Sequence, residues 1–241
     1  IKIYKDKFFA IDFENTLICY SIVTGNELWK IRTDKSFINS QQKLSLIVAN
    51  DMVVFNNSIG DITAVEIDNG NLIWQTPTQS SAIYENSFFL KTSEIIEYKK
   101  SILFSNNSNE FFSINIQNGT INWKQKINSN LKPTATDKFI FTVTLEGFLV
   151  VLNFKSGKII RINDVFYNFK EKKRLKIKPV GFIIGTDNAY LTTDNGKLII
   201  IDIKTGTVKS ILKIDNEKIS RPFVLDQNLF IIKDNSIIKL N

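Results

Sequence analysis

Short apolar runs separated by polar residues recur along the whole chain. The runs are rich in Ile, Val, Leu and Phe, and almost none follows the period of roughly 3.6 residues typical of a helix. Brief β-branched and aromatic runs bounded by polar turns predict strands. The best defined are Phe8–Asp12, Met52–Phe55, Ile102–Ser105, Phe139–Thr142 and Ala189–Thr192. Only residues 85–100 could hold a short helix, and we expect a strand and a loop there.

Further strands are expected where a proline follows a basic residue. Lys132-Pro133, Lys178-Pro179 and Arg221-Pro222 mark these positions, and proline is tolerated at the start of a strand because no N–H is needed there. Together with the runs above, these signals predict antiparallel sheets of four strands.

One unit of two strands joined by a glycine turn occurs five times. Its copies are Leu17–Trp29, Ile62–Trp74, Phe111–Trp123, Phe148–Arg161 and Leu198–Ser210. The turn glycines are Gly25, Gly70, Gly119, Gly157 and Gly206, and consecutive ones lie 38 to 49 residues apart. A repeat of about 40–50 residues made of short strands is typical of β-propeller blades.

Two further positions of the unit carry a constant chemistry. The residue four before each glycine has a polar acceptor, which predicts a side chain that closes the turn on backbone N–H groups. These residues are Ser21, Glu66, Asn115, Asn153 and Asp202. Trp29, Trp74 and Trp123, the three tryptophans of the chain, all lie four after a glycine. We expect them to wedge between neighbouring sheets, and we expect weaker or differently built contacts at the equivalent Arg161 and Ser210.

The pattern predicts an all-β chain, residues 1–241 forming a single propeller domain. The expected blades are residues 1–34, 35–80, 81–128, 129–168 and 169–217, with a partial sixth at 218–241. The chain is expected to open at the second strand of its first blade and to end at the third strand of the sixth. Because an open arc would expose sheet edges, these blades are interpreted as an incomplete part of a ring of about eight.

Composition argues against most enzyme chemistry. The chain has no His and a single Cys, so His-based acid–base groups, nucleophilic dyads and internal disulfides are excluded. Cys19 lies in an apolar run and is predicted to be a buried core residue. The Asp and Glu residues do not follow the spacing of a Ca²⁺ loop, so no metal site is expected. No apolar run approaches the ~18–20 residues of a membrane-spanning helix.

The excess of positive charge is concentrated in one place. Lys and Arg together number 31 and Asp and Glu together number 24, which gives a net charge of +7. This basic composition either reflects an AT-rich genome or indicates a basic site. Between Phe166 and Pro179 the basic residues are Lys170, Lys172, Lys173, Arg174, Lys176 and Lys178, against Glu171 alone. This segment is either a docking loop for an acidic partner or for anionic lipid head groups, or a solvated loop. Nucleic acid is not expected, because no aromatic platform accompanies the charge.

A second long insertion, residues 78–100, contains Tyr84, Phe88 and Phe89. It is either a hydrophobic docking loop or the place where Phe88–Leu90 forms the innermost strand of the third blade. The second interpretation is preferred, because a buried strand accounts for the apolar run without a partner.

The unit resembles the quinoprotein-type propeller repeat, with its Ala-x-Asp-x-x-Thr-Gly-x-x-x-Trp pattern. The nearest matches are Ala64–Trp74, where Glu66 replaces Asp, and Asp202–Gly206, which lacks the Trp. One branch of that family holds pyrroloquinoline quinone and Ca²⁺ beneath adjacent cysteines, and this chain has one Cys. The resemblance therefore favours the BamB-like scaffold branch, with a fragment of a quinone-dependent dehydrogenase as the alternative.

The resemblance implies a non-catalytic scaffold without a cofactor. Its partners would be outer-membrane assembly subunits or unfolded barrel proteins, and its compartment the periplasm or cell envelope. The chain begins at Ile1 without a leader, so a signal peptide is expected to be absent or already removed, and membrane attachment would use a missing N-terminal lipid anchor.

Overall fold

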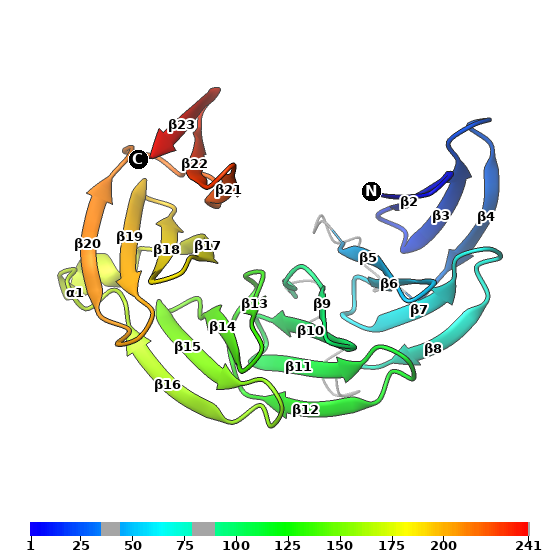
Figure 1. The fold of residues 1–241 in the computed structure, drawn as a ribbon, viewed down its shortest axis with the longest axis horizontal. Coiled ribbons are helices and arrows are strands. Elements are labelled where there is room, and N and C mark those ends of the chain that lie inside the picture. Colours follow the sequence, from blue (N-terminus) through cyan, green and yellow to red (C-terminus); the bar gives the residue numbers. More distant parts are fainter. Residues whose placement is uncertain (35–43, 79–89, 241) are drawn as a thin grey trace. The chain divides into compact units, whose positions relative to one another are not determined.

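The computed structural model describes residues 1–34, 44–78 and 90–240. They form antiparallel sheets in two compact units, Ile1–Asn130 and Leu131–Asn241 (Figure 1). In each sheet the strands are hydrogen-bonded in chain order, so every connection within a sheet is a hairpin. The expectation of a single domain stays a prediction.

The first unit contains three four-stranded sheets. The first sheet comprises β1 (Lys2–Tyr4), β2 (Lys7–Ile11), β3 (Thr16–Ser21) and β4 (Glu27–Arg32). The second comprises β5 (Leu46–Ala49), β6 (Met52–Asn56), β7 (Ile62–Glu66) and β8 (Leu72–Thr76). The third comprises β9 (Ile96–Tyr98), β10 (Ser101–Asn106), β11 (Glu110–Asn115) and β12 (Ile121–Gln125).

The second unit contains two four-stranded sheets and one of three strands. The fourth sheet comprises β13 (Thr134–Ala135), β14 (Phe139–Val143), β15 (Phe148–Asn153) and β16 (Ile159–Asp164), and is followed by α1 (Glu171–Arg174). The fifth comprises β17 (Pro179–Ile184), β18 (Asn188–Thr193), β19 (Lys197–Asp202) and β20 (Val208–Lys213). The sixth comprises β21 (Phe223–Leu225), β22 (Asn228–Lys233) and β23 (Ser236–Leu240).

The predicted all-β architecture of four-stranded antiparallel sheets is confirmed, and two details are wrong. The first sheet begins with its own first strand, β1, which is short and carries a lysine and so gave no apolar run. The first described strand of the third sheet is β9, and the strand expected at Phe88–Leu90 stays a prediction. Residues 79–89, including Tyr84, Phe88 and Phe89, lie outside the described residues. The one-turn helix α1 was not expected, because four residues are too short for a helical period.

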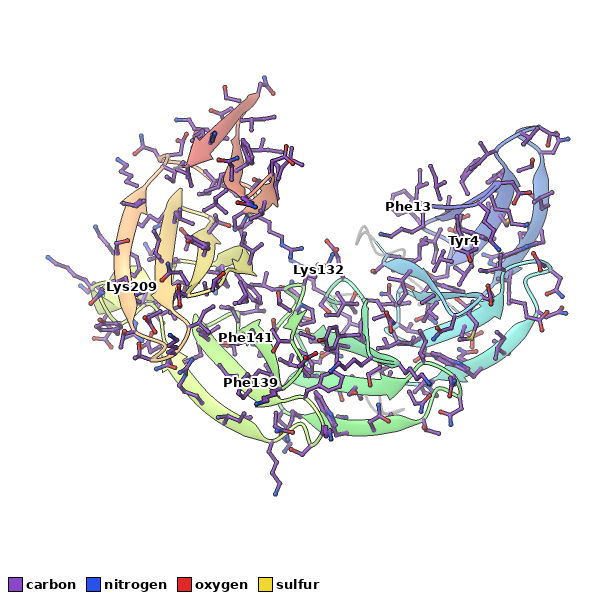
Figure 2. All side chains as sticks on the ribbon, viewed as in Figure 1. Tyr4, Phe13, Lys132, Phe139, Phe141 and Lys209 are labelled. Atoms are coloured by element: carbon purple, nitrogen blue, oxygen red, sulfur yellow. The ribbon has the colours of Figure 1, made fainter. Side chains whose placement is uncertain are left out.

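The apolar core lies between successive sheets. Phe9, Cys19 and Trp29 of the first sheet cluster with Val53 and Phe55 of the second, and an equivalent cluster joins the second sheet to the third. In the second unit, similar clusters join the fourth sheet to the fifth and the fifth to the sixth. Strand β6 is buried along its whole length because both of its faces are covered. The glycine turns contribute Ile67 and Ile116 to these clusters, whereas Phe13, between β2 and β3, is exposed (Figure 2).

The repeated glycines have the left-handed backbone that their turns require. Their φ angles lie between +66° and +76°, a region that glycine enters without a steric penalty. Each glycine N–H donates to the carbonyl four residues earlier, at 2.8–3.1 Å. The five turns therefore share one backbone geometry, with a glycine at the same place in each turn.

Candidate interaction surfaces

The polar residue four before each glycine lies at the start of its turn. Four of these side chains accept a hydrogen bond from a backbone N–H of the same turn, at 2.8–3.2 Å. They are Ser21, Asn115, Asn153 and Asp202. Glu66 instead accepts a bond of 2.6 Å from the side-chain amide of Asn69. These contacts are local to each turn, so they fix its shape and leave no group directed at a ligand.

Asp202 is held as a carboxylate by its turn. Its Oδ1 accepts from the N–H of Thr205 at 2.9 Å, and its Oδ2 lies 3.0 Å from the ammonium of Lys209 on β20. The backbone hydrogen bond, with the Lys209 contact, lowers the pKa of Asp202 from 3.8 to about 2. The side chain is therefore committed to the turn over the physiological pH range.

In the first unit, two tryptophans connect consecutive sheets. The Nε1 of Trp29 donates to the carbonyl of Ile67, and the Nε1 of Trp74 donates to the carbonyl of Ile116, both at 3.0 Å. Each acceptor lies three residues before the turn glycine of the next sheet. The indoles also cover these glycines, since a Cβ built on Gly70 would lie 2.6 Å from Cε3 of Trp29. Glycine is therefore needed here for space as well as for its backbone angle.

In the second unit, Arg161 takes the position of the indole. Its guanidinium donates to the carbonyls of Ile203 and Lys204, and Ile203 lies three residues before Gly206. A Cβ on Gly206 would collide with the side chain of Asn163. The contact is thus built differently, as expected: the acceptor carbonyl is retained while a cation and an amide replace the indole.

The two remaining residues in this position are Trp123 and Ser210. Trp123 stacks on Phe111 of the neighbouring strand, with 5.8 Å between ring centroids. Ser210 lies on β20 opposite Ile200 and is half-buried. The sequence pattern identified the positions of the hydrogen-bond donors. The acceptors are backbone carbonyls, which every residue has, so the acceptor residues Ile67, Ile116 and Ile203 were not anticipated.

The basic segment, residues 170–178, has a defined structure anchored on apolar side chains. Phe166, before the segment, and Ile177, near its C-terminal end, are buried, and Phe169 lies edge to face against Phe166 with 5.9 Å between centroids. The N–H groups of Lys173 and Arg174 donate to the carbonyl of Lys170 and close the single turn of α1. The segment is therefore held in place at both of its ends.

The basic side chains of this segment differ in how far they are exposed to solvent. Arg174 forms an ion pair with Asp164 and is half-buried. Lys170, Lys172, Lys173 and Lys176 are exposed, as is Lys178. Leu175 is 78% exposed among them, and Tyr167 is 52% exposed nearby. Four of the five predicted docking residues thus form a cationic surface with an exposed leucine, and the fifth has a structural partner.

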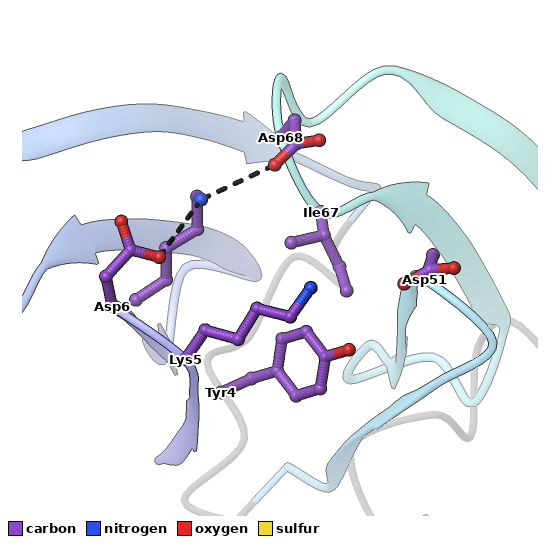
Figure 3. A pocket seen from close by; sticks show the side chains of 7 residues that line it. Tyr4, Lys5, Asp6, Asp51, Ile67 and Asp68 are labelled. Atoms are coloured by element: carbon purple, nitrogen blue, oxygen red, sulfur yellow. Dashed lines mark hydrogen bonds and ion pairs between the residues drawn. The ribbon is translucent and has the colours of Figure 1, made fainter.

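A small pocket of about 170 Å³ lies between the first and second sheets (Figure 3). It is lined by Tyr4, Lys5, Asp6, Lys7, Asp51, Ile67 and Asp68. The Lys7 ammonium lies 3.4 Å from carboxylate oxygens of both Asp6 and Asp68. Desolvation opposes the charge of Lys7, but the hydrogen bonds and charges of the two carboxylates outweigh it and raise the pKa of Lys7. Lys7 and the carboxylates of Asp6 and Asp68 neutralise one another, and we assign the pocket no ligand.

The residues do not fit the quinone and Ca²⁺ of the dehydrogenase branch. Cys19 is the one cysteine of the chain and is fully buried between the first two sheets, so it has no adjacent thiol with which to contact a quinone. Burial raises the pKa of the Cys19 thiol to about 11, although the charge of Lys7 opposes the shift. Within residues 1–34, 44–78 and 90–240, no three His, Cys, Asp or Glu side chains are grouped to hold a metal ion. None of the helices in these ranges could span a membrane.

Comparisons with known proteins agree with this architecture. The sequence profile of the family described as outer membrane protein assembly factor BamB matches residues 2–163. The structure of BamB from Moraxella catarrhalis has a TM-score of 0.78 and 14% identity, over 98% of this chain and 70% of that one. No curated protein matches the sequence.

Two other solved structures share the fold. The computationally designed Ika8 protein has a TM-score of 0.72 at 13% identity, over 99% of this chain and 68% of that one. The β-propeller domain of Cps50 (Swd1) from Myceliophteria thermophila has a TM-score of 0.63 at 10% identity, over 95% and 77%. The predicted β-propeller fold is thereby confirmed. The profile match spans well over half of the sequence, and the chain belongs to the family of the outer membrane protein assembly factor BamB.

Proposed function

We propose that this chain is a non-catalytic scaffold that binds other proteins during outer-membrane assembly, in the periplasm or cell envelope. The observation that supports this most strongly is the match to the BamB family over residues 2–163. That family is named for an outer membrane protein assembly factor, although a propeller can host many functions. The proposed partners are therefore subunits of the assembly machinery or unfolded barrel proteins.

The chemistry of the chain is consistent with binding rather than catalysis. It contains no His, and its single thiol is buried with a raised pKa. The repeated polar residues Ser21, Asn115, Asn153 and Asp202 are occupied by their own turns. In this proposal the repeat signature maintains the fold, and the exposed loops carry the function.

We place one partner contact on the basic segment. Lys172, Lys173 and Lys176 are exposed on a turn whose neighbours Phe166 and Ile177 are buried. A preformed cationic surface attracts an acidic protein partner with little loss of backbone entropy. The exposed Leu175 supplies an apolar contact at its centre.

Binding by purified components tests the proposal. The chain is immobilised, and purified outer-membrane assembly subunits and a urea-unfolded barrel protein are titrated over it at low and high salt. The triple variant Lys172→Glu, Lys173→Glu, Lys176→Glu tests the basic segment. The matched control, Lys138→Glu, Lys155→Glu, Lys158→Glu, reverses three exposed lysines of the same unit.

We expect saturable binding that the first triple variant weakens about tenfold and the control leaves unchanged. That factor follows from the loss of three exposed charge pairs worth roughly 0.5 kcal/mol each. Equal weakening of binding by both variants would contradict the docking site on the basic segment, while the scaffold proposal would still stand.

The enzyme alternative is tested by adding pyrroloquinoline quinone and Ca²⁺ and following bound-quinone absorbance and dye reduction. Substrate-dependent dye reduction without protein binding would overturn the scaffold proposal.

A further inference from the structure

The excess of positive charge belongs to the second unit. Leu131–Asn241 contains 19 Lys and Arg residues against 11 Asp and Glu, whereas residues 1–130 contain 12 against 13. The basic segment, residues 170–178, accounts for only part of this excess, so further basic residues of the second unit lack a matching acid.

Two of these residues, Lys197 and Lys213, lie directly opposite each other in the fifth sheet. Lys197 begins β19 and Lys213 ends β20, and the next pair on the same face is Ile199–Ile211. Like charges that face each other across an antiparallel pair destabilise it. Among the residues that the structure describes, no carboxylate forms an ion pair with either lysine. The sheet therefore holds two positive charges side by side without neutralising them.

The carboxylates nearest to this lysine pair along the chain are engaged elsewhere. Asp194 accepts a hydrogen bond of 2.8 Å from the backbone N–H of Lys178. Asp215 lies 2.5 Å from the ammonium of Lys233 on β22, and this contact, together with two backbone N–H groups, lowers the pKa of Asp215. The lysine pair is therefore a place where the folded chain can accept negative charge from outside.

The lysine pair is continuous with the basic segment. The ammonium of Lys197 lies over the ring of Phe169, 5.8 Å from its centroid, and Phe169 directly precedes Lys170. Phe169 and Ile211 both pack against the apolar cluster that contains Phe166 and Ile177. The end of the fifth sheet and the basic segment thus rest on one apolar cluster and form one cationic surface.

We propose that Lys197 and Lys213 extend the basic segment into a two-part site for an acidic peptide segment of a partner protein. Carboxylates of that segment bind the lysine pair in one part of the site, and Lys172, Lys173 and Lys176 bind further carboxylates in the other. The partner is a protein because this site rests on the proposed function.

The lysine pair favours an acidic ligand for a physical reason. In the free chain the two ammonium groups repel each other across the strands, and a carboxylate bound beside them removes that repulsion. Lys197 is half-buried and held over Phe169, so it loses little side-chain entropy on binding. Lys213 is exposed and reachable from solvent. A neutral or basic segment relieves no repulsion, which is why the partner segment must be acidic.

Titration of a fluorescently labelled oligo-glutamate peptide with the full chain, followed by anisotropy, tests the site without any assembly subunit. Lys213→Glu turns the like-charge pair into an opposite-charge pair, and Lys213→Gln removes the charge without reversing it. Lys155→Glu is the matched control, because Lys155 is an exposed lysine of the same unit, in the turn after β15. Urea denaturation of the free proteins measures the repulsion, and circular dichroism confirms that each variant is folded.

We expect Lys213→Glu to weaken peptide binding about fivefold, Lys213→Gln to weaken it less, and Lys155→Glu to leave it unchanged. In the free protein at low salt, Lys213→Glu should raise the urea midpoint, because attraction replaces repulsion, and high salt should shrink that rise. Equal weakening by Lys213→Glu and Lys155→Glu would overturn the two-part site, as would a midpoint that does not rise.

Two further outcomes separate this site from its alternatives. Tighter Lys213-dependent binding to phosphatidylglycerol vesicles than to the peptide would make the ligand a lipid surface and would overturn the inference. Lys213-dependent peptide binding by a chain that binds no assembly subunit would support the site and contradict the proposed function.

Discussion

The indole N–H of Trp29 donates a hydrogen bond of 3.0 Å to the backbone carbonyl of Ile67, on the neighbouring sheet. The same indole covers Gly70, three residues further along. Trp74 repeats both contacts with Ile116 and Gly119, and Arg161 repeats the hydrogen bond with Ile203. The same hydrogen bond therefore connects the first sheet to the second, the second to the third and the fourth to the fifth, although the donor side chain changes.

Removing the indole N–H of Trp29 should destabilise the chain modestly. Trp29→Phe keeps an aromatic ring between the sheets but leaves the carbonyl of Ile67 without its donor, at an expected loss of about 1 kcal/mol. Trp29→Ala also leaves a cavity and should lose about 3–5 kcal/mol. Urea denaturation followed by circular dichroism measures both. Equal losses for the two variants would mean that the ring contributes nothing beyond its hydrogen bond.

Gly70 and Gly25 form a matched pair that separates backbone strain from packing. Their φ angles are +75° and +73°, so alanine incurs the same left-handed penalty of roughly 1–2 kcal/mol at either position. A Cβ on Gly70 also meets the Trp29 ring at 2.6 Å, whereas no described residue lies within 4 Å of one on Gly25. Gly70→Ala should therefore lose about 1–3 kcal/mol more than Gly25→Ala in urea denaturation. Indistinguishable losses would contradict the contact.

Much of the fold could be predicted from the sequence because its strands alternate with polar turns and its turns contain glycine. The strand β1 was missed because three residues with an exposed lysine give no apolar pattern. The strand expected at Phe88–Leu90 falls on residues that the structure does not describe and stays a prediction, while the strand Ile96–Tyr98, which pairs with β10, was not anticipated.

The interaction surfaces were predictable only in part. The cluster of lysines is visible as composition, but the ion pair of Arg174 with Asp164 depends on how the segment folds back on β16. The exposure of Leu175 also follows from that fold. The acceptor carbonyls of Ile67, Ile116 and Ile203 carry no side-chain signal at all, so sequence reasoning located the donors and not the acceptors.

Cys19 should be inert in the folded protein. Burial raises the pKa of its thiol to about 11, and the thiolate is the species that reacts with disulfide reagents. At pH 8 we expect no reaction with Ellman's reagent under native conditions and one equivalent of reaction in denaturing urea. Fast native reaction at pH 8 would show that the space between the first and second sheets is open to solvent.

Asp202 should contribute to acid stability over a narrow range. Its pKa is about 2 in the folded chain against an ordinary 3.8, so its stabilising effect is complete above about 4 and is lost as the pH falls toward 2. Asp202→Asn should reduce the fall in stability within that window. Urea midpoints measured between pH 5 and pH 2 compare the two proteins. Parallel curves over this range would contradict the proposed role of the Thr205 N–H and Lys209.

Exchange of the indole protons with solvent tests the repeated contact between sheets most directly. In protein labelled with ¹⁵N at the tryptophan indoles, Trp29→Phe and Trp74→Phe identify the two resonances. We expect both protons to exchange slowly and only through opening of the sheet interface, because each is buried and bonded to a carbonyl of the next sheet. Exchange of both at the rate of a free indole would contradict the account.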